Sequence, residues 1–481
     1  LMTEALRMAA DDAGPGGALL AAADTLVAIE LTADSSEGRA LGLPGYANVP
    51  AAVAEALGIE PARQLYTASG GNTPQLLVNR FAESIAKGES ETVLITGAEA
   101  LDGMFQRLKQ GLDLDAWQSG NGPPPERATE DRAPATPHEV NHGIQLPAAV
   151  YPLFENALRG AYGESLEAHR QRIGGLFHRF TRVAAENPLA WFPIERSAEE
   201  LVTPGPKNRL VGFPYTKYLN AIINVNMGAA LILTSRRRAL ELGVAEDRLV
   251  YLHGCAEACD HWYLHERVNY HSSPAIRCIG QRALKMAGRG IDDIDYFDIY
   301  SCFPSAVQIA CDELGIPQDD PRGLTVTGGL PYFGGPGNNY STHAIAGMMQ
   351  KLRADPGSYG LVNANGWFIT KHAIGIYSTE PSTGNWRRED PASYREEALA
   401  TPPPPFTEDP GGDATIETYT VVFGRNGPEQ GLVIGRTADG TRFIANTPSD
   451  EQTLTRMTEV DMLGASGVVT SSDGRNVFTL D

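Results

Sequence analysis

The chain has 481 residues and a formal net charge of −20, from 59 acidic and 39 basic side chains. This length is sufficient for two to four domains with sizeable cores, and the strong negative charge argues against nucleic acid or an anionic membrane as a partner. No window is long and apolar enough for a transmembrane helix. Five cysteines at irregular spacing argue for a reducing compartment, taken here as the cytoplasm, and against a disulfide framework.

Residues 1–115 alternate extended and helical patterns. Residues 24–30 predict a buried strand, residues 51–57 a helix ended by a glycine, and residues 74–88 a longer helix that also ends at a glycine. A second strand is predicted at 92–96. This alternation is typical of an α/β sheet with helices packed on its faces.

The middle of the chain differs in composition and in charge. Residues 119–137 are rich in Pro, Gly and polar side chains and predict a loop, residues 140–220 are helical and aromatic, and residues 224–234 return to an apolar core pattern. No aspartate occurs between Asp131 and Asp247. A basic island in an acidic chain suits a small polyanion, although the same residues also suit solvated helix faces. The island contains Arg170, Arg172, Arg179, Arg182, Arg196, Lys207, Arg209, Lys217 and Arg236 to Arg238.

The second half of the chain repeats the α/β pattern in a similar order. Two halves of this kind predict two similar sheets with helices between and outside them. The expected elements are a strand at 249–253, a helix at 275–288, a segment at 291–298 that leads into a strand, a helix at 304–314, and strands at 360–363 and 373–377.

After residue 381 the composition changes again. The run of prolines at 401–406 predicts a stiff linker. The tail contains two hairpin signals, Asn426-Gly427 and Asp439-Gly440, and one possible helix at 449–463. A small β-barrel of the OB type fits this pattern. Its expected strands are 415–423, 431–436, 441–445 and 467–470.

The segment Leu-Tyr-Thr-Ala-Ser-Gly-Gly at 65–71 lies directly before the helix predicted at 74–88. A helix N-terminus lowers the pKa of a thiol, but it does not usefully ionise the hydroxyl of Thr67, which would need a general base within hydrogen-bond reach. No His, Asp or Glu stands beside Thr67 in the sequence. Thr67 and Ser69 are therefore interpreted as parts of a helix cap and tight turn, with a nucleophilic role as the alternative.

The order of these segments resembles the nucleophile region of the thiolase superfamily. There a Cys-x-Ser-Gly turn opens a central helix, and the next strand ends in a Gly-x-Glu turn, which Gly97 and Glu99 match. Thr67 stands at the position of the nucleophilic cysteine, and every cysteine of this chain lies at or after Cys255. The added C-terminal tail makes the whole chain similar to the thiolase-like proteins of type 1, which are relatives of the sterol-carrier-type thiolases.

Three further motifs align with catalytic positions of that family. The segment 297–304 resembles a His-Asp-Cys-Phe motif with Tyr300 at the oxyanion-hole position, where a tyrosine can donate a hydrogen bond or simply pack in the core. Gly335 replaces the histidine of a Gly-His-Pro motif, and His343 lies too far along the chain to substitute for it. Ala364, or Asn365 in a register shifted by one, stands at the second cysteine.

The resemblance implies the thiolase fold, with two similar α/β halves in a five-layer αβαβα sandwich, plus a small C-terminal OB-like β-barrel. The first strand of that fold has no counterpart, because residues 1–14 already form an amphipathic pattern. We therefore expect that leading residues were removed, and a targeting peptide remains compatible with the sequence. The expected domains are 1–115 with 222–245, an inserted loop domain at 116–221, a second half at 246–385, a linker at 386–412 and a β-domain at 413–481.

The function implied is that of a thiolase-like protein of lipid metabolism that binds CoA or an acyl-CoA without the usual thiolysis. The alternatives are a retro-aldol lyase that uses Tyr300, with Tyr340 nearby in sequence, and an acetyl-CoA acetyltransferase, as overall similarity would name it. CoA is a ligand or substrate and no other cofactor is implied. A monomer is expected, with the family's dimer as the alternative. The expected CoA contacts are Lys207, Arg209, Lys217, Gly334, Asn365 and Gly366.

One further cluster, at 253–261, contains residue types that bind zinc. His253, Cys255, Cys259 and His261 lack the spacing of a zinc knuckle. The segment begins on a predicted core strand, where free cysteines pack as small apolar side chains. We therefore expect buried thiols here and no metal site.

Overall fold

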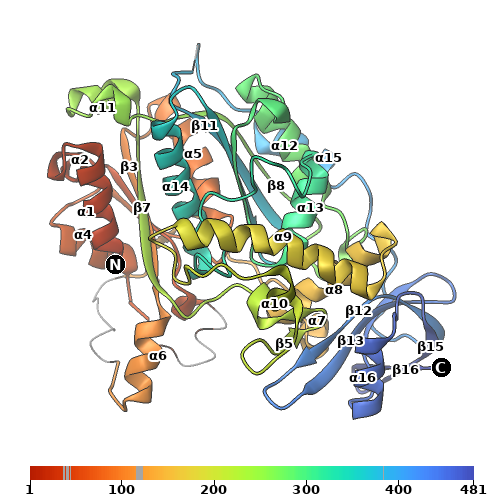
Figure 1. Cartoon of the computed structure of the whole chain (residues 1–481). Coiled ribbons are helices and arrows are strands. Elements are labelled where there is room, and N and C mark those ends of the chain that lie inside the picture. Colours follow the sequence, from red (N-terminus) through yellow and green to blue (C-terminus); the bar gives the residue numbers. More distant parts are fainter. Residues whose placement is uncertain (36–37, 39–42, 44, 115–122, 383) are drawn as a thin grey trace.

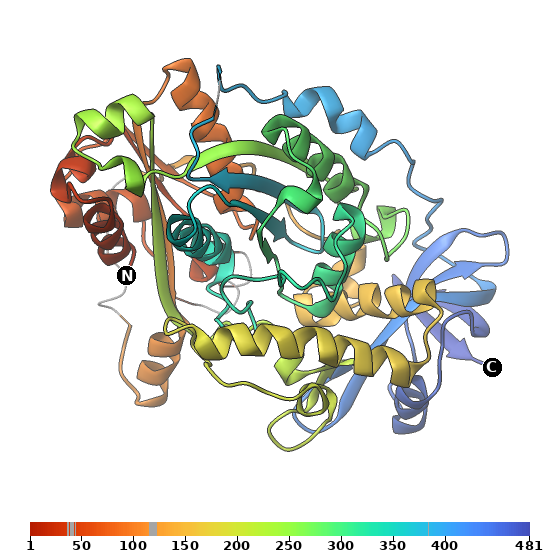
Figure 2. The ribbon, with the colours of Figure 1, turned by 45° about the horizontal axis from the view of Figure 1, so that its top comes forward.

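The computed structural model describes residues 1–35, 38, 43, 45–114, 123–382 and 384–481. Two α/β halves are stacked on each other, and an inserted helical segment connects them to a C-terminal β-barrel (Figure 1). The barrel and the N-terminal helices lie at opposite sides of the molecule in both views (Figure 1, Figure 2). The boundary near residue 115 and the first part of the loop predicted at 119–137 fall outside the described residues.

The N-terminal half contains a five-stranded sheet in the order β4-β2-β1-β3-β7. β1 pairs in parallel with both β2 and β3, so Val27 lies beside Leu65 on one side and Ile95 on the other. β7 is antiparallel to β3. The bounds are β1 Thr25–Ala28, β2 Arg63–Tyr66, β3 Thr92–Ala100, β4 Glu126–Arg127 and β7 Asn226–Thr234.

The C-terminal half contains a four-stranded sheet in the order β8-β11-β10-β9. β10 pairs in parallel with β9 and antiparallel with β11, which repeats the arrangement of β3 with β1 and β7. β8 is longer than the strand predicted at 249–253. The bounds are β8 Tyr251–Cys259, β9 Tyr296–Ile299, β10 Tyr359–Gly366 and β11 Lys371–Ser378.

Helices α5 (Thr73–Lys87) and α14 (Tyr340–Ala354) lie between the two sheets and contact both of them. Helices α1 (Met2–Ala13) and α4 (Val49–Leu57) cover the outer face of the N-terminal sheet, and α12 (Pro274–Ala287) covers that of the C-terminal sheet. This arrangement confirms the predicted αβαβα sandwich. The helices at 304–314 and 74–88 were also predicted to within one residue, as α13 (Pro304–Leu314) and α5.

The helix ends follow local sequence rules. The side chain of Asn48 accepts a hydrogen bond from the amide of Ala51 at the start of α4, as a helix cap requires. Helix α5 has a proline in its first turn and ends at Gly88 with φ of 75°. A left-handed residue at this place favours glycine, which is why these ends could be read from the sequence.

The internal repeat is incomplete at one edge. β11 pairs on its outer edge with β8, whereas in the described part of the chain β7 pairs only with β3. Beside β7 lies a groove of about 820 Å³, with walls from α1, α5, β7 and α14. The groove runs along β7 and also contacts Tyr251 and Leu252 at the start of β8.

The inserted segment and the C-terminal tail share one sheet. The five barrel strands close through the pairing of β12 with β13, and α16 (Glu451–Glu459) lies between the third and fourth strands. This confirms the predicted OB-like barrel. β12 continues the sheet into β5 (Leu210–Gly212) and β6 (Tyr215–Thr216) of the insertion, which the sequence did not predict. The barrel strands are β12 Gly412–Phe423, β13 Pro428–Thr437, β14 Arg442–Asn446, β15 Ser466–Ser472 and β16 Arg475–Leu480.

Buried polar contacts also join the barrel to α8 (Pro147–Tyr162) of the insertion, which precedes α9 (Leu166–Glu186). The side-chain amide of Asn156 donates to the carbonyls of Phe213 (3.2 Å) and Tyr419 (2.9 Å). The hydroxyl of Thr418 donates to a backbone carbonyl of α8 at 2.5 Å, and Arg159 forms an ion pair with Asp461. In the described residues, no helix is long and apolar enough to cross a membrane.

Asn156→Ala should weaken the attachment of the barrel. The change removes the donor to the Tyr419 carbonyl, whereas the Phe213 carbonyl keeps a hydrogen bond from the Thr420 hydroxyl at 2.9 Å. An unsatisfied buried polar group costs about 1–3 kcal/mol. Urea denaturation should show a loss of this size in the free energy of unfolding. Thr455→Ala, at an exposed position on α16, is the control and should change it by less than about 0.5 kcal/mol. Equal stability of the two variants would contradict the structural role of Asn156.

Candidate active site

The turn between β2 and α5 is the centre of the candidate site. Thr67 is completely buried, and its Oγ1 accepts a hydrogen bond from the backbone amide of Glu30 at 2.8 Å. The Thr67 carbonyl accepts from Arg127. This hydroxyl therefore ties the end of β1 to the end of β2, which agrees with the structural interpretation of Thr67.

Ser69 lies two residues further along and does have an acid–base partner. Its hydroxyl donates to Oε2 of Glu30 at 2.5 Å, and Arg127 lies 3.1 Å from the other oxygen of the same carboxyl group. Burial raises the pKa of Glu30, while the bonds from Ser69 and Arg127 act in the opposite direction. No general base near this turn was predicted from the sequence. Glu30 was missed because it follows a neighbouring parallel strand, whose carboxyl end reaches the same edge of the sheet.

Lys371, the first residue of β11, was also missed. Its Nζ donates to the Ser69 carbonyl at 2.5 Å and lies 5.7 Å and 5.5 Å from the ring centres of Trp262 and Trp367. Burial lowers the pKa of Lys371 to about 8. No local pattern marks this lysine, because it reaches the turn only through the pairing of strands far apart in sequence.

Tyr300 faces the same turn from the C-terminal half. Its hydroxyl packs against Gly71, where any side chain would collide with it, and its ring lies edge-on to Tyr340 at 5.4 Å. Burial raises the pKa of Tyr300, so the phenol is neutral at physiological pH. Within the described residues its hydroxyl makes no hydrogen bond. Tyr340 donates to the buried Asp298 at 3.1 Å, whose pKa burial raises to about 6.

Asn365 and Cys302 lie next to Tyr151 of helix α8. The amide nitrogen of Asn365 donates to the Tyr151 hydroxyl at 3.0 Å, and that hydroxyl donates to the carbonyl of Trp367 at 2.5 Å. Burial raises the pKa of Cys302 to about 12, so its thiol stays protonated. Asn365 Oδ1 is buried without a partner among the described atoms.

The turn after Gly366 is strained. Trp367 and Ile369 have φ angles of 54° and 55°, and a β-branched residue in the left-handed region is uncommon. Such strain clusters at functional sites. The turn connects β10 to β11 and so fixes the positions of Asn365 and Lys371.

Gly335 and Ala364 bring no functional group to the site. The Gly335 amide donates to the carbonyl of Ile222 at 2.8 Å, and a Cβ on Gly335 would lie 2.9 Å from that carbonyl oxygen. Ala364 is buried on β10 opposite Ala373. His343 lines the groove beside β7, and burial lowers its pKa to about 4.

Most of the basic island is neutralised by neighbouring acids. Arg170 pairs with Glu167 at 2.5 Å and Arg172 with Glu164 at 2.8 Å, for example. Arg179 bonds only backbone carbonyls, Arg182 has no ion pair in the described part of the chain, and three exposed cations near β5 and β6 are also without an acidic partner. Across the described ranges, Lys207, Arg209 and Lys217 have no carboxylate partner within 4.0 Å. Gly334, with φ of 129°, packs on Met227.

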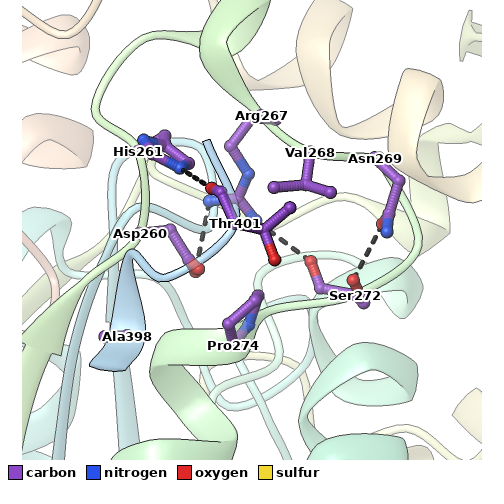
Figure 3. Close-up of a pocket in the computed structure, with 9 residues that line it drawn as sticks. All are labelled: Asp260, His261, Arg267, Val268, Asn269, Ser272, Pro274, Ala398 and Thr401. Carbon is purple, nitrogen blue, oxygen red and sulfur yellow. Dashed lines mark hydrogen bonds and ion pairs between the residues drawn. The ribbon is translucent and has the colours of Figure 1, made fainter. Parts of the chain in front are cut away.

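A small pocket lies at the junction of the C-terminal half with the linker (Figure 3). There the buried Asp260 forms an ion pair with Arg267 at 3.2 Å, and His261 bonds the Thr401 carbonyl at 2.8 Å. Asp260 also accepts from Ser273 at 2.5 Å and from His372 at 3.2 Å. This carboxylate is thus saturated, and the cluster holds the linker against β8.

The His and Cys side chains at 253–261, which are residue types that bind zinc, make separate contacts. His253 bonds the Glu380 carbonyl at 2.7 Å, and burial raises the pKa of Cys255 and Cys259. In the part of the chain that the structure describes, no three His, Cys, Asp or Glu side chains are arranged to hold a metal.

Glu99 lies near the end of β3, where it is paired with Met227 of β7. Its carboxyl accepts from the amide and the hydroxyl of Thr32, both at 2.7 Å. Burial raises the pKa of Glu99 to about 7. The segment matched to the family's Gly-x-Glu turn is therefore strand in this structure, with Gly97 and Glu99 both inside β3, and Glu99 makes a buried structural contact.

These features define a protein of the thiolase fold. Models for the thiolase C-terminal domain-like family and for the additional C-terminal domain of thiolase-like protein type 1 match residues 256–336 and 395–475. A monomeric SCP2-thiolase-like protein type 1 from Mycobacterium smegmatis is 37% identical, with a TM-score of 0.85, over 100% of this chain and 95% of that one. The chain belongs to this type 1 family of thiolase-like proteins.

More distant structures share the fold alone. An Ltp2-ChsH2(DUF35) aldolase is 19% identical with a TM-score of 0.58, over 79% of this chain and 92% of that chain. The dimeric peroxisomal thiolase of Saccharomyces cerevisiae is 15% identical with a TM-score of 0.50, over 75% and 86%. A search of curated proteins gives no match.

Glu99→Gln should change how stability depends on pH. The pKa of Glu99 is raised from 4.5 to about 7, so the stabilisation that depends on its neutral form is complete below pH 4.5 and is lost as the pH rises through 7. Glutamine cannot ionise. Between pH 5 and 8 the wild type should therefore lose more unfolding free energy than the variant, by on the order of 3 kcal/mol.

Thermal or urea unfolding at several pH values measures this difference. Glu60→Gln, at an exposed position, is the matched control and should follow the wild-type profile. Parallel profiles for the wild type and Glu99→Gln would contradict a raised pKa for Glu99.

Proposed function

We propose that this chain binds CoA or an acyl-CoA and lacks the usual thiolase turnover. One observation carries the proposal. Thr67 stands at the expected nucleophile position, and its hydroxyl accepts a hydrogen bond from the backbone amide of Glu30. Gly335 and Ala364 have no side chain that can carry a proton, and the Cys302 thiol is held protonated. General acid–base groups are each worth about 10²–10⁴-fold in rate, so their replacement removes most of the catalysis.

The phosphates of CoA are assigned to Lys207, Arg209 and Lys217. These cations are exposed, lie on neighbouring segments around β5 and β6, and have no acidic partner to displace among the described residues. Cations of this kind attract phosphate through charge-assisted hydrogen bonds. Asn365 and Gly366 would contact the thioester end of the ligand, beside the turn at Thr67, and Gly334 would line the path between the two ends.

Calorimetry should detect binding of CoA that weakens with added salt, because exposed charges are screened. The double change Lys207→Ala with Lys217→Ala should weaken binding by about tenfold, since two charge-assisted bonds are lost. Arg236→Ala with Arg237→Ala, at exposed cations of α11 (Arg236–Glu241) that already have glutamate partners, should leave the affinity unchanged. Acetoacetyl-CoA thiolysis at about 1–10³ per second would contradict the loss of thiolase activity.

Retro-aldol cleavage is the second candidate, and it is favoured by the Tyr300 hydroxyl, which has no hydrogen-bond partner among the described residues. In this reaction the proton of a β-hydroxyl is removed, the bond between Cα and Cβ breaks to release a carbonyl product, and the thioester enolate takes up a proton. A neutral phenol beside the turn is placed to donate a hydrogen bond to the thioester oxygen as negative charge develops there. An aldolase shares the fold.

Tyr300→Phe tests this second activity. Incubation of the wild type with β-hydroxyacyl-CoA thioesters should release a carbonyl product that can be captured as a hydrazone. The variant should be slower by about 10²–10³-fold, the cost of removing an oxyanion donor. Tyr296→Phe is the control, because Tyr296 begins β9, the strand that ends just before Tyr300, and its hydroxyl donates to the exposed Asp355. If the wild type releases no product, the lyase function is excluded.

We further propose that the protein is a monomer, as the relative from Mycobacterium smegmatis is described. The large net negative charge disfavours non-specific association. The dimer remains the alternative, and light scattering at micromolar concentration distinguishes one chain mass from two.

A further inference from the structure

A buried histidine connects the inserted segment to the barrel at the joint between β14 and β16. His142 follows the short helix α7 (Pro137–Asn141) and is completely buried. Its Nδ1 lies 2.8 Å from the carbonyl oxygen of His138, and its Nε2 accepts a hydrogen bond from the backbone amide of Asn476 at 2.9 Å. The His142 carbonyl accepts from the side-chain amide of Asn446, also at 2.9 Å. His142 thus contacts both β16 and β14.

The two partners of the His142 ring determine its protonation state. A carbonyl oxygen only accepts and a backbone amide only donates, so Nδ1 carries the proton and Nε2 presents its lone pair. The imidazole is therefore neutral while this contact is formed. A proton on Nε2 would point at the N–H of Asn476, which would break the hydrogen bond and leave a charge in a fully buried position.

The joint between β14 and β16 has few other hydrogen bonds. Among the described residues the two strands pair at one place, Asn446 with Val477, and the side-chain amide of Asn476 donates to the Ile444 carbonyl at 2.8 Å. The other side of the barrel is held more extensively, because β12 pairs with β13, β15 and β5 and packs on α8. Loss of the His142 contact should therefore loosen β14 and β16 and leave β12 in place.

The environment of the ring disfavours a second proton. Burial lowers the pKa of both His142 and the neighbouring His138, and it is the largest effect on each. Nearby acids favour protonation, whereas nearby basic groups disfavour it. The groups that face the two rings are Glu408 and Asp409 of the linker, Glu139 of α7, His265 after β8 and Arg475 of β16. The two ring centres lie 4.4 Å apart, so a charge on one disfavours a charge on the other.

We propose that His142 is a pH-sensitive contact, whose protonation opens the barrel locally at the joint between β14 and β16. Above about pH 6.5, the ordinary pKa of histidine, the neutral ring keeps the joint closed. As the pH falls below this value, the open form takes up a proton that the closed form excludes, so the stabilisation from the contact is lost. The joint contains none of the residues assigned to CoA, and this opening is independent of the proposed function.

Hydrogen–deuterium exchange of the full chain tests the proposal, with peptide mass spectrometry and a correction for the intrinsic effect of pH on exchange. Peptides from β16 should exchange about tenfold faster or more at pH 5 than at pH 7.5, because acid raises the population of the open form. Peptides from β12, in the same barrel, should change by less than about twofold. Equal protection of β16 at the two pH values would overturn the proposal.

His142→Gln removes the titrating ring and keeps a side-chain oxygen that can accept from the Asn476 amide. The exchange of β16 in this variant should be the same at both pH values. His271→Gln, the same change at an exposed histidine, should behave as the wild type does. Acceleration at pH 5 that persists in His142→Gln would assign the opening to another group and overturn the role of His142.

NMR of the wild type labelled with ¹³C at its histidine rings gives a second measurement, which decides the question if His142→Gln opens the joint at both pH values. The ring signal that is missing from His142→Gln should titrate over the same pH range in which β16 loses protection. Titration of this ring while β16 stays protected would overturn the proposal.

Discussion

The candidate active site depends on hydrogen bonds between the two halves. They join residues 338–341, at the start of α14, to the turn before α5 and to the ends of neighbouring strands. Asn338 accepts from the amide of Gly70 at 2.8 Å and donates to the carbonyl of Glu30 at 3.0 Å. The side-chain amide of Asn339 donates to the Gly97 carbonyl, and the hydroxyl of Ser341 donates to the Gly71 carbonyl. One short segment of the C-terminal half therefore contacts the end of β1, the turn before α5 and strand β3 of the N-terminal half.

This interlocking holds the backbone around the site in a defined shape. Buried backbone groups need partners, and Asn338 supplies them where two turns end. The side chains that face the site can then change without loss of the framework. Thr67 is one of the supports, because its hydroxyl accepts a hydrogen bond from a backbone amide, while Tyr300 and Lys371 lie against the same turn.

The elements that the sequence predicted well are those that local chemistry determines. Helix α5 could be placed because a proline and a final glycine mark its ends, and the halves could be paired because they repeat one order. Glu30 and Lys371 could not be placed at the turn, since each arrives through strand pairing over long sequence separation. The basic island was overestimated, because the glutamates that neutralise Arg170 and Arg172 lie on the same helical segment.

The pairing of β12 with β5 also determines how the chain can be divided. Residues 401–403 of the proline-rich segment are exposed, and exposed connecting segments are where proteases cut. A cut there would leave the barrel attached, because β12 hydrogen-bonds to β5 and packs on α8. The two fragments would co-purify and separate only under denaturing conditions. The point in the sequence where the barrel begins is therefore not the edge of the folded unit to which it belongs.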